Sequence, residues 1–226
     1  MKVLVVEDDR RLSDMLVAML QESGFVCDVA YDGNTAHELG STEFYDAAVL
    51  DLGLPELDGI SVLQAWRDGG CAMPVLILTA RGRWSEKLAG FNAGADDYVT
   101  KPFEAEEVSV RLRALIRRSA GHASPELRIS DLVLNTMSNR ATNNGVPLSL
   151  TSLEFRVLSY LMHHPGRVIS RTEFLEHVYE SESDPDSNVI DVIIGRLRKK
   201  IGSAKITTVR GQGFRLESWE AVDAKP

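Results

Sequence analysis

Residues Ala47–Gly59 read AAVLDLGLPELDG, and this stretch decides the fold of the first half of the chain. Its first four residues are apolar and run directly into Asp51, a pattern expected for a strand that is covered on both faces. Ile60–Trp66, which follows, has helical periodicity. The stretch therefore predicts a buried strand followed by a helix, with Asp51 at the carboxyl end of the strand.

The same alternation of strand and helix extends outward from this stretch in both directions. The predicted strands are Lys2–Val6, Val26–Ala30, Ala47–Asp51, Val75–Thr79 and Tyr98–Val99. Segments with helical periodicity separate or follow them, at Arg11–Gln21, Ile60–Trp66, Trp84–Asn92 and Glu104–Arg118. Repeated alternation of this kind predicts an α/β fold, a (βα)5 doubly wound parallel sheet.

Ligands of such sheets bind at the carboxyl ends of the strands, and several polar residues fall there. The first strand ends in Glu7-Asp8-Asp9, the third in Asp51, the fourth in Thr79-Ala80, and the fifth runs into Lys101. Carboxylates that meet at one edge repel one another unless a cation neutralises them, and Mg2+ suits hard oxygen ligands. A hydroxyl and a lysine at the same edge supply a hydrogen bond and a positive charge for a phosphoryl group. The set describes phosphoryl transfer to an aspartate.

Each of these residues alone is more often an ordinary surface or helix-capping group. Their coincidence at the one edge where such a sheet binds ligands favours a site. The motifs VVEDD, VLDLGLPELDG, ILTAR and GADDYVTKPF also resemble the receiver domain of two-component response regulators, over residues 1–118. The resemblance implies that Asp51 is the phosphoacceptor and that Mg2+ is bound by Glu7, Asp8, Asp51 and the backbone carbonyl of Gly53. It further implies a set of switch and phosphoryl-contacting residues, Thr79, Ala80, Tyr98 and Lys101, and a cis Lys101–Pro102 bond.

Charge divides the 226 residues into two unlike halves. The net charge of −8 lies in residues 1–118, with 12 basic and 20 acidic residues, whereas residues 119–226 have 13 of each. Within the second half, residues 187–215 contain seven basic residues and one acid, Asp191. An acidic module joined to one with a basic stripe indicates two domains with different partners.

The N-terminal sequence MKVLVVEDD has only a five-residue apolar run before its acids, so we expect no signal peptide. No apolar stretch approaches the ~20 residues of a membrane helix. The two cysteines, Cys27 and Cys71, lack metal-ligand spacing and are too few for a disulfide framework. Reduced thiols and a cytoplasmic location are therefore expected.

The second half begins with a polar segment, residues 119–126, which we interpret as a linker to a domain over residues 127–220. Strands are predicted at Leu127–Ile129, Leu132–Leu134 and Val146–Leu150, with a turn at Asn143-Asn144-Gly145. Two helices should follow, because Thr151 with Glu154 and Ser170 with Glu173 have the spacing of a capping box.

The third helix, predicted over Ser187–Ile201, is the most informative. Ile190, Ile194, Leu197 and Ile201 make one apolar stripe, opposite a polar and basic side. A helix buried on one side and basic on the other is suited to the major groove of DNA, although a solvated charged face is the commoner meaning of such a cluster. The predicted hairpin of Ile206–Val209 and Phe214–Leu216, with its glycine-rich basic turn, favours DNA.

The segments LTSLEFRVLSYL, GRVISRTEFLEHV, NVIDVIIGRLRKKIG and TVRGQGFRLE resemble the winged helix-turn-helix domain of the OmpR/PhoB family, over about 127–218. The sequence departs from the usual family pattern at Ile193 and Gly195. The loop Glu180–Asp186 stands where relatives contact RNA polymerase, and an ordinary solvated loop is equally expected there. The resemblance implies DNA contacts by Asn188, Val192, Gly195, Arg196, Arg198, Lys199, Arg210, Gly211 and Gly213.

Together the two resemblances imply a response regulator and not a dedicated enzyme. A sensor histidine kinase would phosphorylate Asp51, and the protein would then dimerise and bind tandem promoter sites. Residues expected at the dimer interface are Lys87, Asp96, Asp97, Glu107, Arg111 and Arg118, with Lys87–Glu107 and Asp97–Arg111 as pairs between chains. Two alternatives remain open at this point: a phosphotransferase or phosphatase, and a DNA-binding regulator whose degenerate receiver only dimerises.

Overall fold

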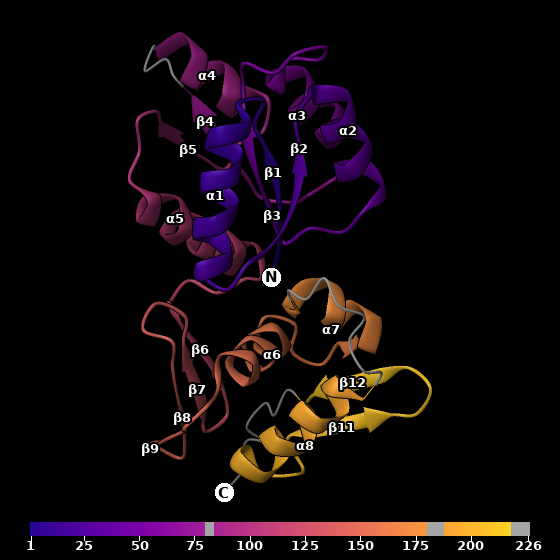
Figure 1. The fold of residues 1–226 in the computed structure, drawn as a ribbon. Helices are drawn as coiled ribbons and strands as arrows, with labels where there is room; N and C mark the ends of the chain where they lie inside the picture. Colours follow the sequence, from indigo (N-terminus) through magenta and orange to yellow (C-terminus); the bar gives the residue numbers. More distant parts are fainter. Residues whose placement is uncertain (80–83, 180–187, 218–226) are drawn as a thin grey trace, which may run out of the picture. The chain divides into compact units, whose positions relative to one another are not determined.

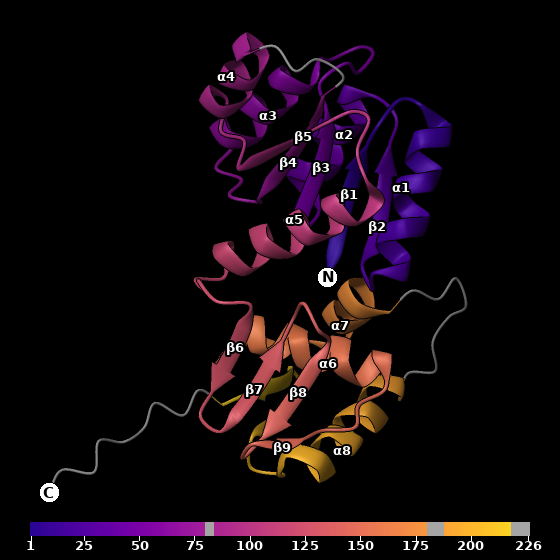
Figure 2. The same ribbon diagram turned by 90° about the vertical axis from the view of Figure 1, so that its left-hand side faces the viewer.

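The computed structural model describes residues 1–79, 84–179 and 188–217, with only the backbone of 84–87 and 105. The chain divides into two compact units, Met1–Ser119 and Ala120–Pro226. Figures 1 and 2 show the elements of each unit. Within the described residues, none of the helices has the length and apolar character that a membrane crossing requires.

The first unit contains one parallel five-stranded sheet, so the predicted fold class is confirmed. Its strands, in the order β2-β1-β3-β4-β5, are β1 (Lys2–Val6), β2 (Val26–Ala30), β3 (Ala47–Asp51), β4 (Val75–Thr79) and β5 (Asp97–Thr100). All of the predicted strands form, and only β5 is longer than expected. After β2 the chain passes to the other side of β1 and forms β3, so β1 and β3 pair directly and their carboxyl ends lie side by side.

Helices cover both faces of this sheet (Figure 1). α1 (Arg10–Glu22) and α5 (Ala105–Ser119) share one apolar cluster, which includes Leu16 and Leu112. On the other face, α2 (Gly33–Thr42) and α3 (Gly59–Asp68) share a second cluster, with Ala93 just after α4 (Trp84–Asn92). α2 was not predicted, because its two glycines, its serine and its two threonines leave a weak apolar stripe.

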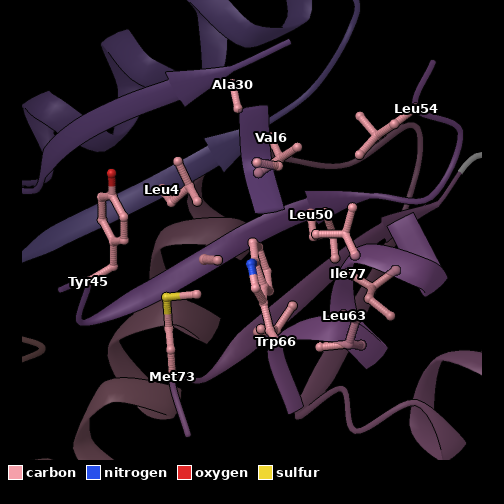
Figure 3. Close-up of a cluster of buried hydrophobic side chains, with 14 of the residues drawn as sticks. Leu4, Val6, Ala30, Tyr45, Leu50, Leu54, Leu63, Trp66, Met73 and Ile77 are labelled. Atoms are coloured by element: carbon pink, nitrogen blue, oxygen red, sulfur yellow. The ribbon is translucent and has the colours of Figure 1, made fainter. Parts of the chain in front are cut away.

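Trp66 is the largest side chain in the second cluster (Figure 3). It is 1% exposed and lies among Leu4, Leu50 and Leu63, and its indole Nε1 donates to the His37 carbonyl oxygen of α2 at 3.4 Å. A Cβ on Gly40 would lie 2.4 Å from the Trp66 ring. The glycine in the weak helix is therefore what lets α2 approach the tryptophan of α3.

Aspartates begin three of the helices in this unit. Asp9, Asp32 and Asp58 each accept backbone N–H groups of the first turn of α1, α2 and α3, respectively. Such caps satisfy donors that have no partner within the helix. Asp9 thus caps α1, whereas its neighbours Glu7 and Asp8 belong to the cluster of carboxylates at the sheet edge.

The second unit begins with an antiparallel sheet in the order β6-β7-β8-β9, namely β6 (Glu126–Ile129), β7 (Leu132–Asn135), β8 (Arg140–Asn143) and β9 (Val146–Pro147). The strand predicted over Val146–Leu150 is shorter in the structure. β8 was not predicted, because its sequence RATN has no apolar run and only Ala141 is buried.

Three helices and a second antiparallel sheet complete this unit. The helices are α6 (Ser152–His163), α7 (Arg171–Val178) and α8 (Val189–Ile201). The sheet has the order β10-β12-β11, from β10 (Val168–Ile169), β11 (Ile206–Val209) and β12 (Gly213–Leu216). Thr151 and Glu154 form the predicted capping box, and Ser170 caps α7. A third helix followed by a two-stranded hairpin confirms the winged helix-turn-helix prediction.

Candidate functional site

Three carboxylates meet at the carboxyl edge of the parallel sheet. Glu7 and Asp8 follow β1, Asp51 ends β3, and one oxygen of each lies within 4.8 Å of the others. Glu7 is 1% exposed and Asp51 is 7% exposed, whereas Asp8 is exposed. The arrangement is thus a cluster of two buried carboxylates and one exposed carboxylate, the acidic pocket.

Lys101 supplies the positive charge of this pocket. Its Nζ lies 2.6 Å from Glu7 Oε2 and 3.2 Å from Asp51 Oδ1. The Lys101 backbone N–H donates to the Thr79 carbonyl oxygen at 2.8 Å, which fixes the residue beside the end of β4. The Lys101–Pro102 peptide is cis, as the family resemblance implied.

The environment shifts the titration of both buried partners. Burial raises the pKa of the Glu7 carboxyl, and the Asp51 charge adds to this rise against the opposing effect of Lys101. Burial alone would lower the pKa of Lys101, but its hydrogen bond to Glu7 and the charge of Asp51 outweigh this and raise it. Lys101 therefore stays charged at neutral pH and holds Asp51 by its charge.

The donor set fits Mg2+. With all four side chains ionised, three carboxylates and one ammonium leave a net charge of −2 in the pocket, which a divalent cation would balance. Carboxylate oxygens are the hard ligands that Mg2+ prefers, and the exposed side at Asp8 leaves room for the waters that it keeps.

Two glycines shape the backbone around Asp51. The Gly53 N–H donates to Asp51 Oδ2 at 3.2 Å and so orients the carboxylate. A Cβ on Gly59 would lie 2.2 Å from the Asp51 carbonyl oxygen, so the start of α3 packs directly on the end of β3. The sequence analysis did not single out Gly59, although the motif LDG contains it. The metal contact of the Gly53 carbonyl stays a prediction.

Thr79 and Tyr98 lie beside a small cavity. Thr79 is 3% exposed at the end of β4, and Tyr98 is half-buried on β5. The cavity, about 10 Å3 in volume, is lined by both residues and by Leu52, Ile77 and Phe91 among others. The Tyr98 ring packs edge-to-face on Phe91 of α4, with centroids 5.7 Å apart. Ala80, the remaining predicted switch residue, lies outside the described residues.

The charges predicted for the dimer interface are largely engaged within the chain. Arg111 Nη1 lies 2.8 Å from Asp97 Oδ2, and its Nη2 lies 2.7 Å from Glu107 Oε1. Asp96 pairs with Arg67 at 3.1 Å, and Arg118 Nε donates to the Ala114 carbonyl oxygen at 3.3 Å. The side chain of Lys87 lies outside the described residues. Leu88 and Phe91 of α4 and Val110 of α5, which the sequence analysis did not single out, are each about half exposed.

The predicted recognition helix has the two faces expected of it. Ile190, Ile194, Leu197 and Ile201 are at most 2% exposed, and Ile193 is also buried. On the other side, Asn188, Arg196 and Lys199 are exposed, Val192 is 49% exposed, and nothing lies within 4 Å of a Cβ built on Gly195. Ser187 and the loop Glu180–Asp186 lie outside the described residues.

The seven basic residues between positions 187 and 215 divide into two groups. Four bind other parts of the unit: Lys200 pairs with Glu154, Lys205 with Asp131, Arg215 with Glu217, and Arg198 donates to the Ile206 carbonyl oxygen. The other three, Arg196, Lys199 and Arg210, are exposed, and within the described part of the chain they form no salt bridge. The spacing of these residues in the sequence could not separate the two groups. Arg198, which was predicted to contact DNA, instead binds β11 within its own unit.

The tip of the β11–β12 hairpin depends on two glycines. Gly211 has a φ of +73° in the turn. Gly213 has a φ of +151°, and a Cβ there would lie 2.0 Å from the Ile169 carbonyl oxygen. Gly213 therefore serves close packing on β10, and the exposed turn of Arg210 and Gly211 is the part free to meet a ligand.

Known proteins match both units. Residues 3–113 match the family described as response regulator receiver domain, and residues 145–216 match the one described as transcriptional regulatory protein, C terminal. The chain is 43% identical over 218 residues to the two-component response regulator PhoP of Pseudomonas aeruginosa, covering 95% of this chain and 97% of that protein. It is 39% identical to the transcriptional regulatory protein PhoP of Escherichia coli, covering 96% and 99%. A solved receiver domain, that of Francisella response regulator 1452, is 39% identical with a TM-score of 0.51, covering 52% of this chain and 98% of that one.

Proposed function

This chain belongs to the OmpR/PhoB family of two-component response regulators, and from that premise we propose that phosphorylation of Asp51 controls its binding to DNA. A receiver joined to a DNA-binding domain has a histidine kinase and DNA as its partners. The observation that carries the proposal is the pocket in which Lys101 Nζ lies within 3.2 Å of both Glu7 and Asp51.

Phosphoryl transfer follows from the chemistry of this pocket. An Asp51 oxygen forms the new bond to phosphorus while the bond between phosphorus and the donor atom of the kinase histidine breaks. Glu7, Asp8, Asp51 and the Gly53 carbonyl would hold Mg2+, which would neutralise charge on the phosphoryl oxygens. Lys101 contributes a second fixed positive charge. The Gly53 N–H binds one oxygen of the Asp51 carboxylate, and Gly59 lets the start of α3 pack against the Asp51 backbone.

The signal would pass through Thr79 and Tyr98. A phosphoryl group carries about 1.5–2 negative charges and three acceptor oxygens, in place of the single charge of the Asp51 carboxylate, and these oxygens would lie beside Thr79. We propose that the Thr79 hydroxyl moves to donate to it, with the Ala80 backbone as a further contact. Tyr98 then turns toward the vacated space. Both side chains line the same cavity of about 10 Å3, which is large enough for about one water, so Tyr98 can turn inward only after the Thr79 side chain has moved away.

Dimerisation would then use α4, β5 and α5. Arg111 forms salt bridges with Asp97 and Glu107 of its own chain. In a dimer on this face, Arg111 would exchange Asp97 of its own chain for Asp97 of the second chain. Half-exposed Leu88, Phe91 and Val110 give the face an apolar component. Asp96 and Arg118 complete the proposed set, and Lys87 would pair with Glu107 of the second chain.

Two copies of α8 would bind adjacent half-sites of tandem promoter DNA. Arg196 and Lys199 are exposed on the helix, and Arg210 is exposed on the hairpin. Asn188, Val192 and Gly195 form the side without bulky groups, which permits close approach to base edges. Gly211 and Gly213 shape the turn that carries Arg210, and RNA polymerase would be a further partner of the promoter complex.

The test is incubation of the full-length chain with Mg2+ and acetyl phosphate, followed by intact-mass and peptide mass spectrometry. We expect one phosphoryl group on Asp51, tighter DNA binding, and neither effect in Asp51→Ala. Asp68→Ala, an exposed aspartate of α3, is the matched control and should behave as the parent. DNA affinity that is the same with and without phosphodonor would support a degenerate receiver instead. Repeated turnover of a phosphoester would support an enzyme.

A further inference from the structure

The recognition helix α8 is attached to the wing hairpin at two points. Near its C-terminal half, Arg198 Nε donates to the Ile206 carbonyl oxygen at 2.9 Å, and its Nη2 donates to Thr208 Oγ1 at 2.8 Å, both on β11. In its first turn, Asp191 accepts Arg171 Nε and Nη2, each at 2.7 Å. The second attachment continues to the wing, because the Arg171 guanidinium lies over the Phe214 ring of β12 at 4.8 Å.

Arg171 can make both contacts at once because of its planar guanidinium. Its edge binds the carboxylate with two hydrogen bonds, while its face stacks on an aromatic ring. Phe214 is a rigid support, since it is 2% exposed and β12 is paired on both sides, with β10 and β11. Arg171, the first residue of α7, therefore joins the start of α8 to the centre of the three-stranded sheet.

Two separated attachments fix the direction of a helix, whereas one would let it pivot. Asp191 and Arg198 are seven residues apart, which is about 10 Å along a helix. Helix and hairpin carry different exposed basic residues, Lys199 and Arg210, and both can reach one DNA duplex only at one relative angle. We propose that Arg171 is a positioning residue for DNA binding, which sets the angle between α8 and the β11–β12 hairpin. This inference rests on the proposed function, in which both elements contact DNA.

Two simpler roles for the pair make opposite predictions. Arg171 and Asp191 side chains are each 41% exposed, and such pairs contribute little to stability, so a purely structural role predicts little change in DNA affinity. A purely electrostatic role predicts tighter binding without Asp191, because this acid lies on a helix that faces a polyanion. Positioning predicts the reverse: loss of Asp191 weakens binding although it removes a negative charge.

The experiment measures the affinity of full-length variants for a duplex that the full-length parent has selected from random DNA. We expect Asp191→Asn to weaken binding about tenfold at a salt concentration of about 0.15 M. Arg171→Lys should weaken it similarly, because lysine keeps the charge but can neither bind two carboxylate oxygens in a plane nor stack as well. Glu126→Gln, which removes an acid from the exposed Arg128–Glu126 pair on β6, is the matched control and should bind as the parent.

A double-mutant cycle with Arg210→Ala separates positioning from independent contacts. We expect Arg210→Ala to cost about tenfold in the parent but only about twofold in Asp191→Asn, because a misaligned wing has already lost its contact. Thermal unfolding should show that all variants are folded at the assay temperature. If Asp191→Asn is unfolded there, the DNA affinity of Arg171→Lys tests the inference in its place. Tighter or unchanged binding by Asp191→Asn, or additive losses, would overturn the inference. A parent that selects no DNA would contradict the proposed function itself.

Discussion

At the scale of single residues, the proposed phosphorylation of Asp51 depends most on Lys101. It is the basic side chain that contacts two of the three carboxylates, and its raised pKa keeps it charged beside them. Without it, Glu7 and Asp51 would face each other buried and unscreened. In the proposed function, the reactivity of Asp51 and the charge balance of the Mg2+ site would both depend on the contacts of Lys101 with Glu7 and Asp51.

Lys101→Met should slow phosphorylation of Asp51 by about 100-fold, because a preorganised charge at the phosphoryl oxygens is lost. The rate is measured with acetyl phosphate at saturating Mg2+, with intact-mass detection. Lys199→Met, an exposed lysine of α8, removes the same charge far along the sequence and should leave the rate unchanged. A parental rate in Lys101→Met would contradict the role given to this residue.

Glu154 makes the stability of the second unit depend on acid pH. Burial alone would raise the pKa of its carboxyl, but Lys200 at 2.6 Å and the Thr151 N–H at 2.8 Å lower it below its usual 4.5. A carboxyl with a lowered folded pKa stabilises the fold above its unfolded value and loses that contribution as pH falls through the folded value. The contribution is thus complete at pH 7, begins to decline near pH 4.5, and is lost once the pH falls below the folded pKa.

Glu154→Gln should therefore destabilise the unit by about 2 kcal/mol at pH 7 and by less in acid, since the lost bonds involve a charged group. Urea unfolding at pH 7 and pH 4, followed through the NMR signals of α6 and α8, measures the difference. Glu126→Gln, in the exposed pair with Arg128, should show almost none of it. An equal loss at both pH values would mean that the charge of Glu154 is unimportant.

At the scale of elements, the glycines within helices show how packing overrides local preference. Gly40 in α2 lies against Trp66, so a Cβ there would meet the ring at 2.4 Å. Gly195 in α8 has nothing within 4 Å of the same position. Both glycines lower helix propensity equally, but of the two only Gly40 lies where a larger residue would collide with a neighbour. Local sequence gives no means of telling them apart.

Alanine substitutions at these glycines should change stability in opposite directions. Gly195→Ala should stabilise the second unit by up to about 1 kcal/mol, the difference in helix propensity. Gly40→Ala should destabilise the first unit by about 1–3 kcal/mol, because overpacking outweighs the same gain. Urea unfolding of the full-length variants, with α2 and α8 signals followed separately by NMR, checks both signs. A stabilising Gly40→Ala would show that the Trp66 ring moves aside at little cost.

At the scale of the whole molecule, the proposed function couples two units that fold around separate cores. The acidic first half and the basic stretch of the second half are suited to different partners. Coupling through dimerisation needs no fixed contact between the units, since bringing two receivers together raises the effective concentration of two DNA-binding units. What it does need is an interface whose charges are complementary between chains.

A charge exchange tests that interface. Glu107→Lys should weaken the dimer of the phosphorylated chain about tenfold, because Lys87 of the second chain then meets a like charge. Lys87→Glu combined with Glu107→Lys should restore dimerisation by returning the opposite charges. Sedimentation equilibrium with and without acetyl phosphate gives the dimer constant. Glu106→Lys, on the neighbouring exposed position of α5, should have little effect. Failure of the double variant to recover would remove this pair from the interface.

The sequence alone determined the strand–helix alternation, the caps of α6 and α7, and the set of polar residues at the sheet edge. These follow from local rules: apolar runs must be covered, helix ends need acceptors, and parallel strands bring their carboxyl ends together. Thus Asp51, Glu7 and Lys101 could be grouped from their positions after three separate strands. Elements without an apolar pattern, α2 and β8, could not be predicted this way.

Only the tertiary structure decided which of the basic residues near α8 are available to a ligand. Arg196 and Arg198 are two positions apart in one helix, yet Arg196 is exposed while Arg198 binds β11. Similarly, the acid in the basic stretch, Asp191, is held by Arg171, which comes 20 residues earlier. Such pairings depend on how helices and strands pack across long sequence separations, and local patterns contain no information about them. Residue type suggested what the chemistry is, and packing selected which residues can perform it.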